Sequence, residues 1–125
     1  MEKLAVYRCL KCGNVVEVAV VGGGTLVCCG ENMKLLDEKS KEGATEKHLP
    51  VVEDMGNSFK VKVGTVAHPM DAEHWIQFIE VITKDGAIIR RDLSPGQVAE
   101  VIFPMPISML GTVRTECNKH GLWTK

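Results

Sequence analysis

The cysteines and histidines of this chain divide into two groups, each with the composition of a metal site. The 125-residue sequence contains five Cys and four His. Four cysteines lie within the first thirty residues, at Cys9, Cys12, Cys28 and Cys29. The fifth cysteine and the four histidines follow, at His48, His68, His74, Cys117 and His120. Because the two groups use every thiol and imidazole of the chain, the sequence predicts a protein with two metal centres.

The first group is specific in its spacing. In Cys9-x-x-Cys12-Gly13 two sulfurs can reach one ion while backbone N–H groups point at the thiolates, and Gly13 can take a positive φ. Cys28 and Cys29 are adjacent, so both can bind one ion only where the backbone bends sharply. Four thiolates suit zinc and iron alike, and the spacing leaves both metals open. Disulfides are disfavoured for clustered thiols in a reducing cytosol.

The second group is dispersed, and its composition carries the prediction. A lone histidine is usually a surface or core residue, but four histidines with one thiolate form a ligand set for iron, zinc or copper. Pro69 holds His68 in an extended conformation, and Cys117-x-x-His120 resembles a ligand loop. Blue copper proteins also place a late Cys and His on a β-sandwich. They usually add a methionine ligand, whereas this chain continues with glycine, leucine and tryptophan.

Length and charge limit the domain organisation and the partners. Residues 1–36 fall below the roughly 40 residues under which a fold usually needs metals or disulfides, whereas residues 37–125 can form their own core. The charged segment 37–47 (DEKSKEGATEK) predicts a solvated linker between them. The net charge of −1 argues against a nucleic-acid binder. No apolar run approaches the roughly 20 residues of a membrane-spanning helix, so we expect a cytoplasmic protein without nucleic-acid or membrane partners.

Local patterns predict an all-β fold. Alternating or continuous apolar residues separated by turn signals such as Lys84-Asp85-Gly86 predict several short strands after the linker. The expected strands are residues 59–63, 75–83, 87–89, 98–103 and 109–115. This spacing is typical of an antiparallel β-sandwich. In the N-terminal piece, residues 15–21 and 25–27 flank three glycines and predict a small hairpin unit closed by metal.

The motifs of the chain resemble those of the desulfoferrodoxin family, the two-iron superoxide reductases, over essentially the whole sequence. The run from Tyr7 to Val18, together with Cys28-Cys29, is similar to the family's desulforedoxin-like domain. The later motifs match in order and spacing: Glu46-Lys47-His48-x-Pro50, Ala67-His68-Pro69-Met70, His74-x-Ile76 and Cys117-Asn118-x-His120-Gly121-x-Trp123. Phe78 stands where relatives often have Trp, and we expect only a packing effect. The four N-terminal cysteines place the resemblance with the two-iron class.

The resemblance implies two domains and two iron centres. A desulforedoxin-like domain over residues 1–36 would hold an Fe(Cys)4 centre on Cys9, Cys12, Cys28 and Cys29. An immunoglobulin-like antiparallel β-sandwich over residues 37–125 would hold the second iron. Its ligands would be four histidines around the metal and one axial cysteine, with the sixth position open: His48, His68, His74, His120 and Cys117.

The resemblance also implies an activity and partners. A superoxide reductase reduces superoxide by one electron to hydrogen peroxide at non-haem ferrous iron, without releasing oxygen. Glu46 would occupy the sixth position of the oxidised iron, and Lys47 would attract superoxide and organise water for protonation, although composition alone favours two solvated charges. A small donor such as rubredoxin would supply electrons, and the chain would form a homodimer. The main alternative is a zinc-ribbon structural or interaction protein without redox chemistry, followed by a cupredoxin-like electron carrier.

Overall fold

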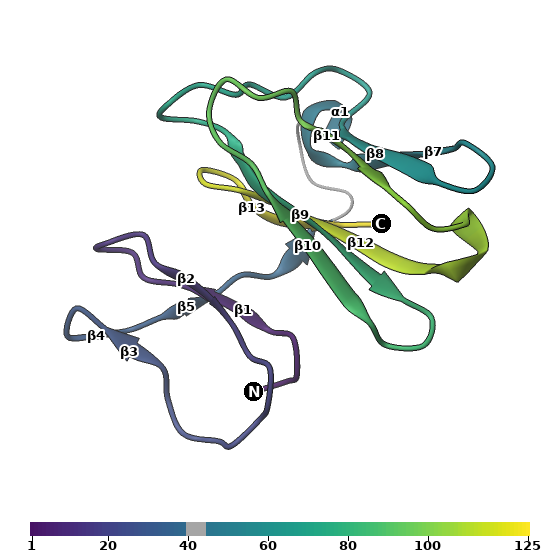
Figure 1. The fold of residues 1–125 in the computed structure, drawn as a ribbon. Helices are drawn as coiled ribbons and strands as arrows, with labels where there is room; N and C mark the ends of the chain where they lie inside the picture. Colours follow the sequence, from purple (N-terminus) through teal and green to yellow (C-terminus); the bar gives the residue numbers. More distant parts are fainter. Residues whose placement is uncertain (40–44) are drawn as a thin grey trace. The chain divides into compact units, whose positions relative to one another are not determined.

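The computed structural model describes residues 1–39 and 45–125 and divides them into two compact units, Met1–Asp37 and Glu38–Lys125 (Figure 1). Nearly all of the regular structure is β-strand, which confirms the predicted all-β fold class. The only α-helix among the described residues, α1 (Thr45–His48), is a single turn. No helix in this part of the chain is long and apolar enough to cross a membrane.

The N-terminal unit consists of two small antiparallel sheets. Strand β1 (Val6–Arg8) lies between β2 (Val15–Glu17) and β5 (Lys34–Leu35), while β3 (Val27–Cys28) pairs with β4 (Glu31–Asn32). The predicted pairing of residues 15–21 with 25–27 is therefore wrong. The cysteine turn after β1 makes the hairpin instead: the N–H of Gly13 donates to the carbonyl of Cys9 (2.9 Å), and the N–H of Cys9 to that of Asn14 (2.9 Å).

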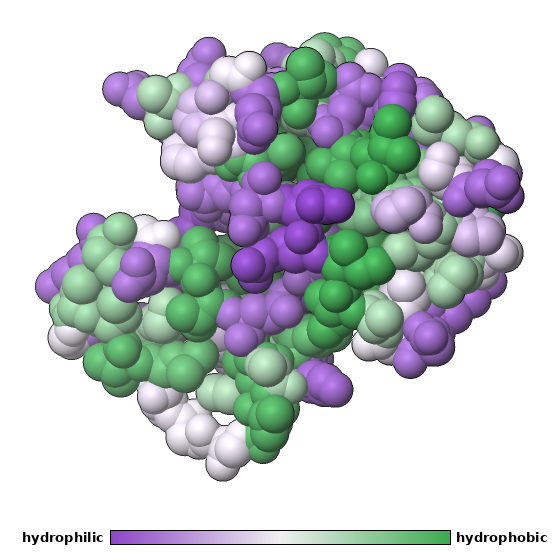
Figure 2. All heavy atoms as spheres, viewed as in Figure 1, coloured by the Kyte–Doolittle hydropathy of each residue, from purple (hydrophilic) through white to green (hydrophobic). Residues whose placement is uncertain are grey.

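The N-terminal unit has very little apolar core. Among its described residues, three apolar side chains are buried: Val6, Cys9 and Val18. Its other large apolar residues are half-buried or exposed, and Figure 2 shows apolar surface on one face; Val20 and Leu10 are 86% and 68% exposed. Burial of so few side chains contributes little stability, because each large apolar residue is worth only about 1.5 to 3 kcal/mol.

The C-terminal unit is a sandwich of two sheets. The larger sheet has the order β10-β9-β12-β13-β6: Ile88–Asp92, Ile76–Thr83, Leu110–Cys117, Gly121–Thr124 and Glu38–Lys39. The smaller sheet has the order β11-β8-β7: Glu100–Phe103, Phe59–Val63 and Pro50–Asp54. All pairs are antiparallel except β13 with β6. A short 3-10 helix, η1 (Ile107–Met109), precedes β12.

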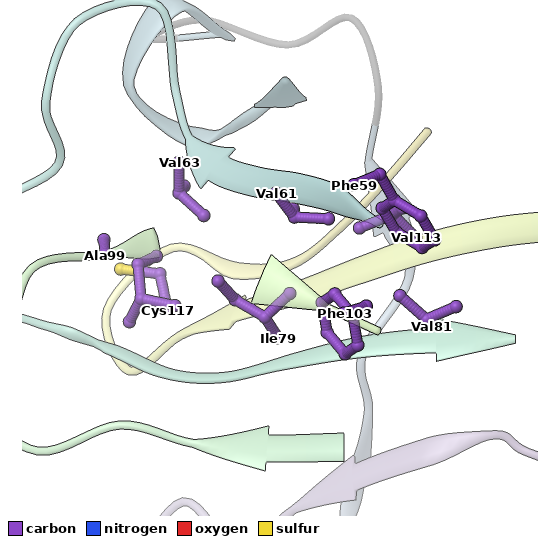
Figure 3. Packing of buried hydrophobic residues seen from close by; sticks show 10 residues of the cluster. Phe59, Val61, Val63, Ile79, Val81, Ala99, Phe103, Val113 and Cys117 are labelled. Atoms are coloured by element: carbon purple, nitrogen blue, oxygen red, sulfur yellow. The ribbon is translucent and has the colours of Figure 1, made fainter. Parts of the chain in front are cut away.

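The core of the sandwich lies between the two sheets. Strand β8 alternates buried and half-buried residues as predicted, and its buried side chains face those of β9 and β12 (Figure 3). The rings of Phe59 and Phe103 stack at 5.5 Å between centroids. Cys117 is fully buried in the same cluster. One predicted metal ligand is thus part of the hydrophobic core.

The predicted linker over residues 37–47 is wrong in part. Strand β6 lies at its start and α1 at its end, while residues 40–44 lie outside the described part of the chain. Strand β6 forms because Glu38 pairs with Leu122 of β13 in parallel, and its carboxylate accepts a hydrogen bond from the buried Arg114 (3.1 Å). Strands β7 and β13 were not predicted.

Candidate metal centres

The Cys9-x-x-Cys12 turn brings two thiols together at the end of β1. The N–H of Cys12 donates to Sγ of Cys9 (3.4 Å), and Gly13 has φ of +83°. Both features match the predicted metal knuckle, since backbone N–H groups stabilise a thiolate and glycine tolerates this φ without strain. The hydrogen bond from Cys12 lowers the pKa of the Cys9 thiol to about 6.

The adjacent cysteines lie on a bent backbone. Cys29 has φ of +52°, which is unusual for a residue other than glycine, and Gly30 follows with φ of +77°. The bend turns the two side chains to one side, so their Sγ atoms lie 4.0 Å apart. The distortion expected for this pair is therefore present. Backbone strain of this kind persists only where its surroundings stabilise it.

The four thiols lie close enough together to bind one metal ion. The ligand atoms of Cys9, Cys12, Cys28 and Cys29 all lie within 4.8 Å of one another. All are free thiols, and the Sγ atoms of Cys12 and Cys28 are 3.6 Å apart, against about 2.05 Å for a disulfide. Hydrogen bonding with the Cys12 side chain raises the pKa of Cys29 to about 12. Ionising all four thiols therefore needs a cation among them.

The second group assembles from distant parts of the C-terminal unit. His48 ends α1, His68 follows β8, His74 precedes β9, Cys117 ends β12, and His120 precedes β13. Their ligand atoms all lie within 4.8 Å of one another. The structure thus brings together all five residues that the sequence predicted for the second centre.

The four imidazoles form a closed ring of neighbours. Ring centroids are 4.7 Å apart for His48 and His68, 4.8 Å for His68 and His74, 5.0 Å for His74 and His120, and 4.6 Å for His120 and His48. All four contacts are edge-on, with interplanar angles from 69° to 79°. Four rings at the corners of a quadrilateral can direct four nitrogens at one ion in their midst. Sγ of Cys117 lies 3.7 Å from Nδ1 of His120 and adds a fifth donor.

The environments of the His68 and His74 rings fit a metal ion. Nδ1 of His68 lies 2.7 Å from the carbonyl oxygen of Pro69, so Nδ1 carries the proton and donates it. Nε2 of His68 then carries a lone pair. This atom and Nε2 of His74 are both buried without a hydrogen-bond partner among the described residues. A buried polar atom without a partner is costly. A metal ion bound to these nitrogens removes that cost, so the residues present fit a metal.

The pKa values favour the ligating form of the histidines. Burial lowers the pKa of His68 to about 4. Burial also lowers the pKa of His74, assisted by the positive charges of His120, Lys119 and Lys47 and opposed by Asp71. Both imidazoles are therefore neutral at pH 7, as metal ligation requires.

Residues behind the ligands hold them in place. The indole of Trp123 stacks on the ring of His48 at 4.8 Å and 16°, and the Thr115 hydroxyl donates to the carbonyl of His48 (3.4 Å). The sequence patterns predicted no role for either residue. Trp123 is part of the motif Cys117-Asn118-x-His120-Gly121-x-Trp123, and its place in that motif was the one sequence feature that could have predicted its contact with the site.

The side chain of Lys47 is described by the structure, whereas that of Glu46 is not. Lys47 is exposed beside the buried His48, at the end of α1, and forms no ion pair with any side chain that the structure describes. Its positive charge is the smallest of the causes that lower the pKa of His74, the largest being burial. The side chain of Glu46 lies outside the described part of the chain.

Fold and sites together define an all-β protein with a four-thiolate group in a small unit and a four-imidazole, one-thiolate group in a sandwich. Two family models match this chain: the desulfoferrodoxin N-terminal domain over residues 1–36 and desulfoferrodoxin over residues 40–125. The chain therefore belongs to the desulfoferrodoxin family, which confirms the resemblance seen in its motifs.

Individual relatives agree with the family models. A desulfoferrodoxin of Syntrophotalea carbinolica is 51% identical over 123 residues, which cover 98% of this chain and 96% of that protein. A desulfoferrodoxin of Nitratidesulfovibrio vulgaris is 48% identical over 118 residues, covering 94% and 92%. The crystal structure of the superoxide reductase from Treponema pallidum is similar, with a TM-score of 0.78 and 31% identity over 98% of this chain and 97% of that one.

Proposed function

We propose that this chain is a superoxide reductase that reduces superoxide by one electron to hydrogen peroxide at a non-haem iron, without releasing oxygen. The observation that carries the proposal is the closed ring of four imidazoles with one buried thiol beside it. Membership of the desulfoferrodoxin family and similarity to a superoxide reductase of known structure support it.

The proposal assigns every residue of the two groups to a metal. His48, His68, His74, His120 and Cys117 would hold the second iron. Iron held in this way would supply one electron to superoxide, and the thiolate would increase its electron density. The four N-terminal cysteines would hold the first iron. Its role would be electron exchange, because Cys12 and Cys29 are exposed.

Lys47 would attract the substrate. The net charge of −1 gives the whole protein no field that draws an anion. A local cation can still act within the screening length of about 8 Å at physiological ionic strength. Support comes from the exposure of Lys47 beside His48 and from its effect on the pKa of His74. We also assign Lys47 the ordering of water that protonates the product.

Glu46 would supply a carboxylate ligand to the oxidised iron after the product has left. This role rests on the match of Glu46-Lys47-His48 to the family motif and on the position of Glu46 two residues before a proposed ligand. A ferric centre favours an anionic oxygen ligand more than a ferrous one does. Glu46 would thus bind in one oxidation state and leave in the other.

A superoxide reductase needs an electron donor. A small redox protein such as rubredoxin would supply electrons. We propose a homodimer formed through the N-terminal unit, whose exposed Val16, Val20 and Val27 would gain burial by pairing. Five free cysteines and the absence of a disulfide among the described residues are consistent with a reducing cytoplasm.

Metal analysis and product stoichiometry test the proposal. The protein as expressed should contain two irons per chain and be coloured, and its reduced form should produce one hydrogen peroxide for each superoxide consumed, with no oxygen. A His120→Ala variant is the control, because it removes one proposed ligand at an exposed position. A colourless zinc protein would favour the zinc-ribbon alternative. Oxygen release with half the peroxide yield would indicate a dismutase instead.

A further inference from the structure

His74, one of the five residues of the second group, lies outside the strands of the sandwich. It lies in the segment between β8, which ends at Val63, and β9, which begins at Ile76. Apart from turns, the described part of this segment has one regular feature, an isolated β-bridge between Asp71 and His74. His74 therefore needs contacts from elsewhere to keep its imidazole in place.

The backbone of His74 is bonded along one edge by its own segment. Its carbonyl accepts a hydrogen bond from the N–H of Asp71 (2.9 Å), and its N–H donates to the carbonyl of Asp71 (3.2 Å). These two bonds close a turn around Ala72 and Glu73. On the opposite edge of His74 lie the carbonyl of the preceding residue, Glu73, and the N–H of the following residue, Trp75.

The side chain of Asn118 occupies that opposite edge. Its Nδ2 donates to the carbonyl of Glu73 (2.9 Å), and its Oδ1 accepts from the N–H of Trp75 (3.0 Å). The backbone N–H of Asn118 adds a bond to the carbonyl of Trp75 (3.3 Å). One primary amide thus takes the place that a neighbouring strand would have, and His74 is bonded on both edges.

Asn118 directly follows Cys117, so this amide connects two proposed ligands that are far apart in sequence. We propose that Asn118 is a positioning residue that holds the His74 imidazole in register with the Cys117 thiolate. The inference rests on the proposed metal role of both residues. It goes beyond that role by assigning their relative placement to one side-chain amide.

The chemistry requires an amide at this position. Glu73 presents an acceptor and Trp75 a donor, and only an amide side chain offers one of each in a planar group of this length. Leucine has nearly the same shape as asparagine but makes neither bond. Residues that orient metal ligands typically contribute 10- to 100-fold in metal affinity. We therefore expect Asn118→Leu to weaken metal binding at the second centre by at least about tenfold.

Cobalt binding provides a test that does not depend on superoxide. Co2+ is titrated anaerobically into the metal-free full-length protein against a competing chelator, and the two centres are followed by their separate absorption bands. Asn118→Leu should weaken Co2+ binding and change the bands at the second centre alone, with the four-thiolate centre as internal reference. Asn57→Leu, at an exposed turn of the same unit, is the matched control. Asn118→Ala is the second variant, in case leucine prevents folding.

A double-mutant cycle separates positioning from general support of the fold. If Asn118 acts through His74, Asn118→Leu should have little further effect on Co2+ affinity in a His74→Ala background but its full effect in a His48→Ala background. Equal losses in both backgrounds, or unchanged affinity and bands in the Leu and Ala variants, would overturn the proposal. Failure of the protein to react with superoxide would leave this test unaffected and would count against the proposed function alone.

Discussion

The two candidate metal centres differ in where their ligands come from and in what holds them. The four thiols belong to residues 9–29 and lie on short strands and turns. The second group spans residues 48–120 and lies at the ends of elements around a sandwich core. The first unit buries three apolar residues, whereas the second has a core cluster of ten. A metal bound in the first unit would therefore supply stability that a larger apolar core would otherwise give. In the second unit, the packed core brings together ligands that lie far apart in the sequence.

The two centres also differ in exposure. Only Cys9 of the first group is buried, and Cys12 and Cys29 are exposed, whereas three of the five residues of the second group, His48, His68 and Cys117, are buried and His120 is exposed. An exposed thiolate centre suits electron exchange with another protein surface. A mostly buried imidazole ring suits chemistry on a small molecule. These differences support distinct roles for the two centres.

Loss of the first metal should unfold only the N-terminal unit. Cys12→Ser removes one of four thiolates, and a unit with three buried apolar residues cannot hold its structure without metal. Backbone amides of residues 1–37 should lose hydrogen-exchange protection, while those of β8, β9 and β12 keep it. Leu10→Ser, within the same turn at an exposed position, is the control. Retained protection in a metal-free N-terminal unit would contradict the comparison.

Loss of a core ring should have the opposite pattern. Phe103→Ala removes a buried ring that stacks on Phe59 and should lower the free energy of unfolding of the C-terminal unit by about 3 to 5 kcal/mol. The neighbouring Ile102 is 50% exposed, so Ile102→Ala should change it by only about 0.5 kcal/mol. Urea unfolding of both variants measures the difference. Loss of metal from the four-thiolate centre in Phe103→Ala would show that the stability of the N-terminal unit depends on the C-terminal unit.

Acid should destabilise the metal-free C-terminal unit through His68. Its pKa is about 4 in the folded protein against an ordinary value of 6.5, so between these values the unfolded chain binds a proton that the folded chain does not. The stability that this group contributes is present above pH 6.5 and is lost as the pH falls to about 4. The difference in unfolding free energy between wild type and His68→Leu should therefore fall over that range. A constant difference would show that His68 is protonated equally in both states.

Lys47→Ala should slow the reaction of the reduced protein with superoxide by about tenfold and flatten its dependence on salt. The reason is that a nearby exposed cation speeds the association of an anion. Pulse radiolysis at several ionic strengths measures both quantities. Lys84→Ala, at the exposed turn between β9 and β10, is the control for loss of one positive charge. The same rate and salt slope in both variants would return Lys47 to the role of a solvated charge.

Glu46→Ala should have the smallest effect on the first step. If Glu46 binds only the oxidised centre, the rate of superoxide capture stays nearly unchanged, whereas the absorption spectrum of the oxidised protein and its pH titration change. An oxidised spectrum identical to wild type at every pH would exclude Glu46 as a ligand. A collapse of the capture rate with all iron retained would require a larger role.

The sequence was most informative where the signal was local. Alternation predicted β8 at its observed bounds. Residue type and spacing predicted two groups of Cys and His, and the structure brings the members of each group together. The N-terminal hairpin was mispredicted because the three glycines were taken as the turn, whereas the cysteine knuckle itself closes β1 onto β2.

Non-local contacts could not be predicted from local patterns. Strand β6 exists because Glu38 and Lys39 pair with β13, more than 80 residues away in the chain. The stack of Trp123 on His48 and the bonds of Asn118 to residues 73 and 75 likewise join segments that only the folded sandwich brings together. Such contacts carry no periodicity and no turn signal in the sequence.

The most direct test of the account compares one ligand removal in each centre. Iron-loaded, fully reduced Cys12→Ser and His74→Ala proteins are exposed to a pulse of superoxide, and the bimolecular rate and the peroxide yield are measured with iron content determined on the same samples. We expect Cys12→Ser to react at the wild-type rate with one peroxide per superoxide, and His74→Ala to lose the reaction. Loss of the reaction in Cys12→Ser with its second iron retained, or full reaction in His74→Ala, would contradict it.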